Sequence, residues 1–86
     1  MLPIRRVLMC LAAGINRFRC PSETVDAYKR FQETYTALKQ CEKKGFIQIK
    51  AVKKEDLTGE HLPIEVETTQ LNVHGIIYLE KLNDAH

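Results

Sequence analysis

The chain has 86 residues, of which 44% are hydrophobic and 28% charged, with four Gly and three Pro. These values exclude a disordered tail, a collagen-like repeat and a mucin-like stalk, and we expect residues 1–86 to form a single domain with one small core. The net charge of +2 hides an asymmetry, because residues 1–54 carry twelve Lys/Arg and four Asp/Glu whereas residues 55–86 carry one Lys and seven Asp/Glu. This division predicts a basic side that faces a polyanion and an acidic side opposite, with chance clustering on a soluble surface as the alternative.

Three cysteines, an odd number without dense spacing, indicate a reducing cytoplasmic setting. Cys10 and Cys41 fall on apolar positions of expected helices, which favours burial, and Cys20 is the one candidate for a reactive thiol. The Cys and His residues have no C-x-x-C or H-x-x-x-H spacing. No nucleophile–base arrangement, phosphate-binding Gly loop or catalytic acid pair stands out. We therefore expect no metal, no cofactor and no enzymatic activity.

The first expected element is a helix from Pro3 to near Gly14, followed by a connector over residues 15–21. Its apolar residues recur at helical spacing: Ile4, Val7, Leu8, Leu11, Ala12 and Ile15. Arg5-Arg6 and the apolar stretch after them imitate a short signal peptide, but the stretch is too short to span a bilayer. We interpret it as the first helix of the domain.

A second helical stretch is expected from Ser22, as N-cap, to Lys44, with Glu23 and Asp26 in its first turn. Its apolar positions are Val25, Tyr28, Phe31, Tyr35, Leu38 and Cys41. This spacing fits one long helix or two helices with a break near Arg30–Glu33, and no Gly or Pro marks the break. The choice matters, because one uninterrupted helix would remove the separate recognition helix that a gene-control function needs.

Gly45 is expected to end the helical stretch in the left-handed conformation. Phe46–Val52 then has the pattern of a strand, residues 55–63 that of a polar loop, and Ile64–Thr69 that of a half-buried strand. Together they predict an antiparallel hairpin with a long tip. Asn72 is the expected cap of a last helix, whose apolar side is Val73, Ile76, Ile77, Leu79 and Leu82.

Two motifs carry a family resemblance. Leu38-x-x-Cys41-x-x-x-Gly45-Phe46-Ile47 resembles the end of the recognition helix in the winged helix-turn-helix superfamily, with Cys41 in place of a second Leu. The segment L-N-V-H-G-I-I-Y-L at residues 71–79 is similar to the L-T-x-x-G-x-x-Y-L that opens the C-terminal helix of many small members, with Asn72 in place of Thr. Within the superfamily, the chain resembles the YjcQ-like small bacterial and phage proteins over about residues 4–82. The resemblance implies an α+β fold with three helices, a β-hairpin wing and a C-terminal helix.

The residue types also predict contact with double-stranded DNA. If Phe31, Leu38 and Cys41 face inward, the outward side of the same helix carries groups suited to bases and phosphates in a major groove. These groups are Thr36, Lys39, Gln40 and Lys43. Flanking phosphate contacts are expected from Arg17, Arg19, Lys29 and Arg30, and from Lys50, Lys53 and Lys54 on the first wing strand. The prediction is a cytoplasmic bacterial or phage transcriptional regulator, acting as a homodimer because one module has a small footprint.

The acidic wing tip favours a rival hypothesis. Glu55, Asp56 and Glu60 would be repelled by phosphates, so the wing either points away from DNA or meets a protein. The rival is a protein-interaction module on the same fold, such as a phage-type inhibitor or an adaptor, whose acidic hairpin binds a basic partner. A thiol or metal sensor is a third, weaker alternative.

Overall fold

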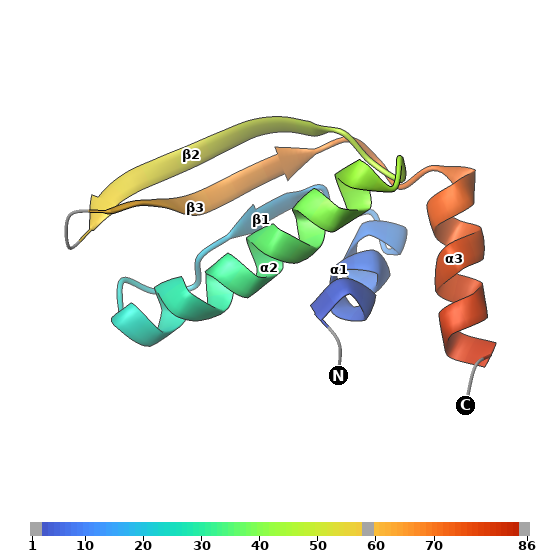
Figure 1. Cartoon of the computed structure of the whole chain (residues 1–86), viewed down its shortest axis with the longest axis horizontal. Coiled ribbons are helices and arrows are strands. Elements are labelled where there is room, and N and C mark those ends of the chain that lie inside the picture. Colours follow the sequence, from blue (N-terminus) through green and yellow to red (C-terminus); the bar gives the residue numbers. More distant parts are fainter. Residues whose placement is uncertain (1–2, 58–59, 85–86) are drawn as a thin grey trace.

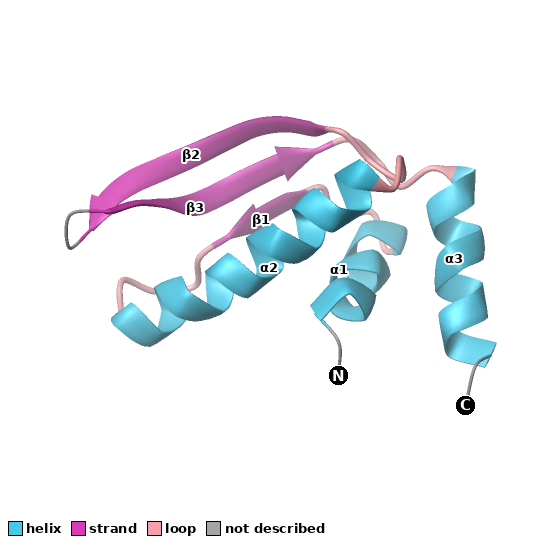
Figure 2. Ribbon diagram, viewed as in Figure 1, coloured by secondary structure: helices cyan, strands magenta, loops and turns pink. Residues whose placement is uncertain are grey.

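The computed structural model describes residues 3–57 and 60–84, and it has an α+β fold (Figure 1). The elements in chain order are α1 (Pro3–Ala12), β1 (Arg17–Arg19), α2 (Val25–Lys43), β2 (Ile49–Leu57), β3 (Glu60–Thr68) and α3 (Val73–Asp84). The strands form one antiparallel sheet in the order β1-β3-β2. One layer is this sheet and the other is helical, with α2 and α1 beneath the sheet and α3 at one end (Figure 2). The expected α+β class is confirmed.

α2 is one uninterrupted helix of 19 residues. The break near Arg30–Glu33, one of the two alternatives that the sequence left open, is therefore absent, and two helices rather than three precede the hairpin. No Gly or Pro interrupts the backbone, and Phe31, Leu38 and Cys41 pack into the core as one continuous stripe. The part of the prediction that required a turn inside this stretch is wrong.

The start of α2 differs from expectation by two residues. Thr24, not Ser22, is the N-cap, and its hydroxyl Oγ1 accepts a hydrogen bond of 3.2 Å from the Ala27 backbone N–H. The Ser22 hydroxyl lies 3.3 Å from Thr24 Oγ1, outside the helix. Asp26 remains in the first turn, whereas Glu23 precedes the cap.

β1 lies within the segment expected as a connector. Phe18 pairs with Val66 of β3, which in turn pairs with Val52 of β2, so these three side chains share the face that packs on the helices. Val66 is completely buried. Because strand side chains alternate, the neighbours of Phe18 point to the opposite face of the sheet.

The hairpin is longer than the sequence indicated. β2 begins at Ile49 rather than Phe46, and both strands continue through most of the segment expected as a loop. The register shifts between Lys53 and Lys54, next to the pairing of Lys54 with Pro63. Such an irregularity accommodates a proline, which has no N–H for the ladder. Residues 58 and 59 of the expected loop lie outside the described residues.

The junction after α2 confirms the expected role of Gly45, which has φ +81°. The Glu42 carboxylate accepts a hydrogen bond of 2.8 Å from the Ile49 N–H and joins the last turn of α2 to the start of β2. Phe46 and Ile47 are buried in this connection. The end of α2 and the root of the hairpin are therefore held as one unit.

α3 confirms the expected cap but not the expected apolar side. Asn72 Oδ1 accepts a hydrogen bond of 3.0 Å from the Gly75 N–H. Leu79 is buried and Leu82 half-buried. The other three apolar residues of the predicted side are exposed: Val73, Ile76 and Ile77. Among the helices and strands, mainly α1 packs against α3, so only one side of α3 is covered.

Candidate nucleic-acid interface

The outward side of the C-terminal half of α2 gathers four of the predicted DNA-contacting residues. All four side chains are exposed, and they line a shallow hollow of about 380 Å³: Thr36, Lys39, Gln40 and Lys43. At about 100° per residue, these positions fall within an arc of about 100° on the helix, away from the buried stripe. We call this set the lysine face.

The lysine face is positively charged and its cations are not neutralised within the described chain. The ion pairs among residues 3–57 and 60–84 involve only two arginines of β1 and two glutamates of β3. Glu42, the only acid between residues 34 and 54, also borders the hollow, but its carboxylate is engaged by the Ile49 N–H. Lys39 and Lys43 are therefore available to an anion from outside.

Lys44 extends the lysine face toward α3, although it is not among the contacts predicted from the sequence. Its Nζ lies 5.4 Å from the centre of the Tyr78 ring, close enough for a cation–π interaction. The Tyr78 ring in turn packs against Phe46, with 5.2 Å between ring centroids. The signal in the sequence was the cluster of lysines at the helix end, which also suits the negative end of the helix dipole.

Arg17 and Arg19 are not brought together with the lysine face. They lie on the outer face of the sheet, the face opposite α2, beside the acids of β3. Arg17 is 3.5 Å from a Glu65 carboxylate oxygen and 3.7 Å from one of Glu67, and Arg19 is 3.4 Å from Glu65. Lys53 pairs in register with Glu65 on the same face. Basic and acidic side chains thus alternate across this surface, and their charges largely cancel.

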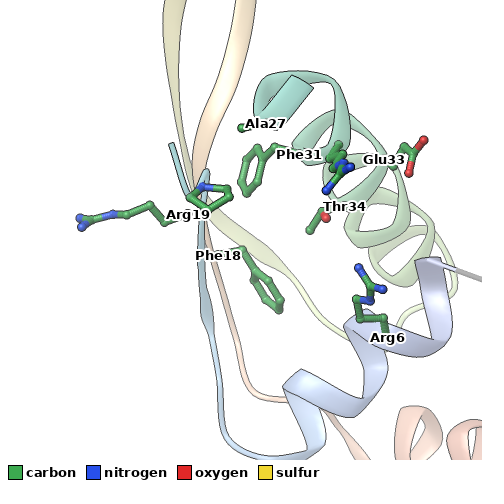
Figure 3. Close-up of a pocket in the computed structure, with 9 residues that line it drawn as sticks. Arg6, Phe18, Arg19, Ala27, Phe31, Glu33 and Thr34 are labelled. Carbon is green, nitrogen blue, oxygen red and sulfur yellow. The ribbon is translucent and has the colours of Figure 1, made fainter. Parts of the chain in front are cut away.

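Arg30 lies on the flank of α2 and borders a different feature, a cavity of about 630 Å³ between α1, β1 and α2. Its lining residues are Arg6, Phe18, Arg19, Pro21, Ala27, Arg30, Phe31, Glu33 and Thr34. In Figure 3, Phe18 and Phe31 form the apolar wall, Arg6 points from α1 toward α2, and the Arg19 side chain extends away. Arg6 adds a cation that the sequence analysis had assigned only to the first helix.

Lys54 lies on the distal hairpin with the acids of the wing, far from the lysine face. Figure 1 shows the end of β2 and the start of β3 beyond the beginning of α2, whereas Lys39 and Lys43 belong to the last turns of α2. A cavity between the end of β1, the start of α2 and the hairpin is lined by both Glu55 and Tyr28. The pKa of Tyr28 is raised by burial and then by nearby negative charges, Glu55 among them. Glu55 therefore lies near the beginning of α2, whereas Lys39 and Lys43 lie in its second half.

The cysteines show no shared site. Cys41 is fully buried, and this burial raises the pKa of its thiol to about 11, so that it stays protonated at neutral pH. Cys20 is half-buried, and its thiol donates to the Ser22 carbonyl at 3.3 Å. Within residues 3–57 and 60–84, no three His, Cys, Asp or Glu side chains are grouped to hold a metal ion. None of the described helices has both the length and the apolar character needed to cross a bilayer.

No protein-family model matches the chain, and no match is found among curated proteins or solved structures. The geometry and charge of the surfaces described above are therefore the basis for a function.

Proposed function

We propose that the protein binds double-stranded DNA through the lysine face of α2. The observation that carries the proposal is the position of Lys39 and Lys43, which are one helical turn apart, exposed, and without an acidic partner in the described chain. Thr36 and Gln40 lie beside them on the same face and supply hydrogen-bonding groups for base edges or phosphates. A 19-residue helix is about 28 Å long and about 10–12 Å wide, which suits a B-DNA major groove about 12 Å wide.

The proposed mode of binding uses the side of a continuous helix, not the helix-turn-helix that the sequence suggested. A winged-helix-like layout is supported by the passage of α2 through Gly45 into an antiparallel hairpin and by the capped α3 that follows. The uninterrupted α2 removes the argument for a separately positioned recognition helix. The gene-control function that required such a helix loses this support, so the proposal is DNA binding alone, and selection from a pool of random duplexes would measure whether the protein prefers a sequence.

The test is fluorescence anisotropy of a labelled mixed-sequence duplex, titrated with the full chain at two salt concentrations. Binding should weaken steeply with salt, because each phosphate contact releases a counterion. Lys39→Ala with Lys43→Ala should weaken binding for all sequences and reduce the slope of log K against log salt by about 2.

The matched control is Arg6→Ala with Lys81→Ala, which removes the same charge from exposed positions on α1 and α3, outside the exposed side of α2. This control should retain most of the affinity and the salt slope. Binding that is insensitive to salt, or equal losses in the two double variants, would contradict the proposal. Lys53→Ala with Lys54→Ala separately tests whether the wing contributes.

The segregated acidic hairpin favours a second candidate function, recognition of a basic protein surface. Glu55 and Asp56 are exposed near the end of β2, and Figure 1 shows this end of the strand beyond the beginning of α2. Under this alternative, Glu55→Lys with Asp56→Lys abolishes capture of a partner and leaves DNA affinity unchanged or higher. A partner that still binds the reversed hairpin would eliminate this candidate.

A further inference from the structure

α3 carries apolar residues on two opposite sides, although only one side is packed. Gly75 and Leu79 are buried against the body of the protein, and Arg5 of α1 donates to Asn83 Oδ1 at 3.0 Å near the end of the helix. The opposite side carries three β-branched residues, Val73, Ile76 and Ile77, with exposed fractions of 60%, 42% and 45%. An ordinary surface helix presents polar residues there. Adjacent exposed apolar residues of this kind mark an interaction surface.

The same exposed side is apolar at the start of the helix and acidic at its end. At about 100° per residue, Glu80 and Asp84 follow Ile76 and Ile77 on it, and both acids are exposed. The first turn of α3 contains no acidic residue. The surface is therefore apolar toward the N-terminus of α3, where the helix dipole is positive, and negatively charged toward the C-terminus. We call the surface formed by residues 73, 76, 77, 80 and 84 the outer face of α3.

We propose that the outer face of α3 binds a second copy of this chain, with the two α3 helices antiparallel about a two-fold axis. In this arrangement Ile76 of each copy packs against Ile77 of the other. Glu80 and Asp84 of each copy then approach the first turn of the opposite helix, where unpaired backbone N–H groups and the helix dipole favour a carboxylate.

The charge distribution selects this occupant and this orientation. A parallel pair would place the Glu80 and Asp84 side chains of both copies together and would be repulsive. In the antiparallel pair Ile76 and Ile77 of the two copies meet at the two-fold axis, and Glu80 of each copy lies beside Val73 in the first turn of the opposite helix, so the same surface serves both copies, as a two-fold interface requires. The first turn has no acid that would oppose the incoming carboxylates.

The contact is small, so we expect a concentration-dependent dimer and not an obligate one. α3 has 12 residues and is about 18 Å long. A pair of helices of this length buries less than the roughly 1,000 Å² expected of a stable interface unless neighbouring surfaces add to it. The inference does not rest on DNA binding, because it concerns the free protein.

The experiment is sedimentation velocity on the full chain over a series of concentrations, without DNA. The unmodified chain should shift from monomer toward dimer as concentration rises. Ile76→Ser with Ile77→Ser should raise the dissociation constant at least about tenfold, because the variant removes the apolar centre of the contact. Glu80→Lys should raise it about three- to tenfold, because the acid near the opposite helix N-terminus becomes a cation on both sides of the dimer.

The matched control is Val25→Ser, which changes an equally exposed apolar residue, 61% exposed, at the start of α2. The control should dimerise like the unmodified chain, and thermal melts should show that all variants remain folded. Glu80→Lys keeps the test valid if the double isoleucine variant unfolds, because it leaves the apolar residues in place. A chain that stays monomeric at every concentration, or an equal effect of Val25→Ser, would overturn the inference.

Lys39→Ala with Lys43→Ala should leave the dissociation constant of the dimer unchanged, so failure of the dimer and failure of DNA binding are distinguishable.

Discussion

Replacing Asn72 by Ala should destabilise the protein, because this one side chain joins α3 to the end of α2. Its Oδ1 accepts a hydrogen bond of 3.0 Å from the Gly75 N–H, and its Nδ2 donates one of 2.6 Å to the Gly45 carbonyl. An N-cap contributes about 1 kcal/mol, and an exposed amide hydrogen bond about 0.5–1 kcal/mol. The two losses in Asn72→Ala therefore lower the free energy of unfolding by about 1.5–2 kcal/mol.

A second substitution separates the two hydrogen bonds of Asn72. Asn72→Thr keeps a hydroxyl oxygen that caps the helix but removes the amide donor to Gly45. We expect it to cost about 0.5–1 kcal/mol, roughly half of the effect of Asn72→Ala. Since about 1 kcal/mol corresponds to about 4–8 °C in a domain of this size, the alanine variant should melt about 10 °C below the unmodified chain.

Urea titration followed by circular dichroism measures these differences, with Gln70→Ala as an exposed control near the same turn. The control should change the free energy of unfolding by less than about 0.5 kcal/mol. Equal destabilisation by Thr and Ala at position 72 would show that the cap contributes nothing. A change below about 0.5 kcal/mol in Asn72→Ala would refute the reasoning as a whole.

Two further predictions concern the core. Gly75→Ala should lower the free energy of unfolding by about 1–2 kcal/mol, although Ala has the better helix propensity. The reason is that its added Cβ would lie 2.8 Å from Leu71 Cγ and 3.1 Å from Phe46 Cβ. A variant that is stabilised in urea titration would contradict this prediction. Burial raises the pKa of the Cys41 thiol to about 11, so the native state holds this proton more tightly than the unfolded state does. The free energy of unfolding should therefore fall as pH rises from about 9 toward 11. Cys41→Ala should show a shallower alkaline decline in the same assay, and an unchanged decline would exclude this thiol as its source.

Features that depend on a few neighbouring residues follow from the sequence. The left-handed conformation of Gly45, the cap at Asn72 and the buried stripe of Phe31, Leu38 and Cys41 all agree with expectation. Each rests on backbone geometry or on the 3.6-residue period, so its cause lies within one or two helical turns. The same period placed Lys39 and Lys43 on the exposed side of α2.

Features that depend on distant partners required the folded chain. Arg17 meets Glu67, fifty residues later in the sequence, and this pairing converts an expected connector into an edge strand and places its arginines beside acids. The sequence left the continuity of α2 open and placed the apolar side of α3 wrongly, because an apolar period shows that a helix has a side to bury but not which neighbours will cover it. Periodicity is a property of one segment, whereas pairing and coverage depend on which other segments reach it in space.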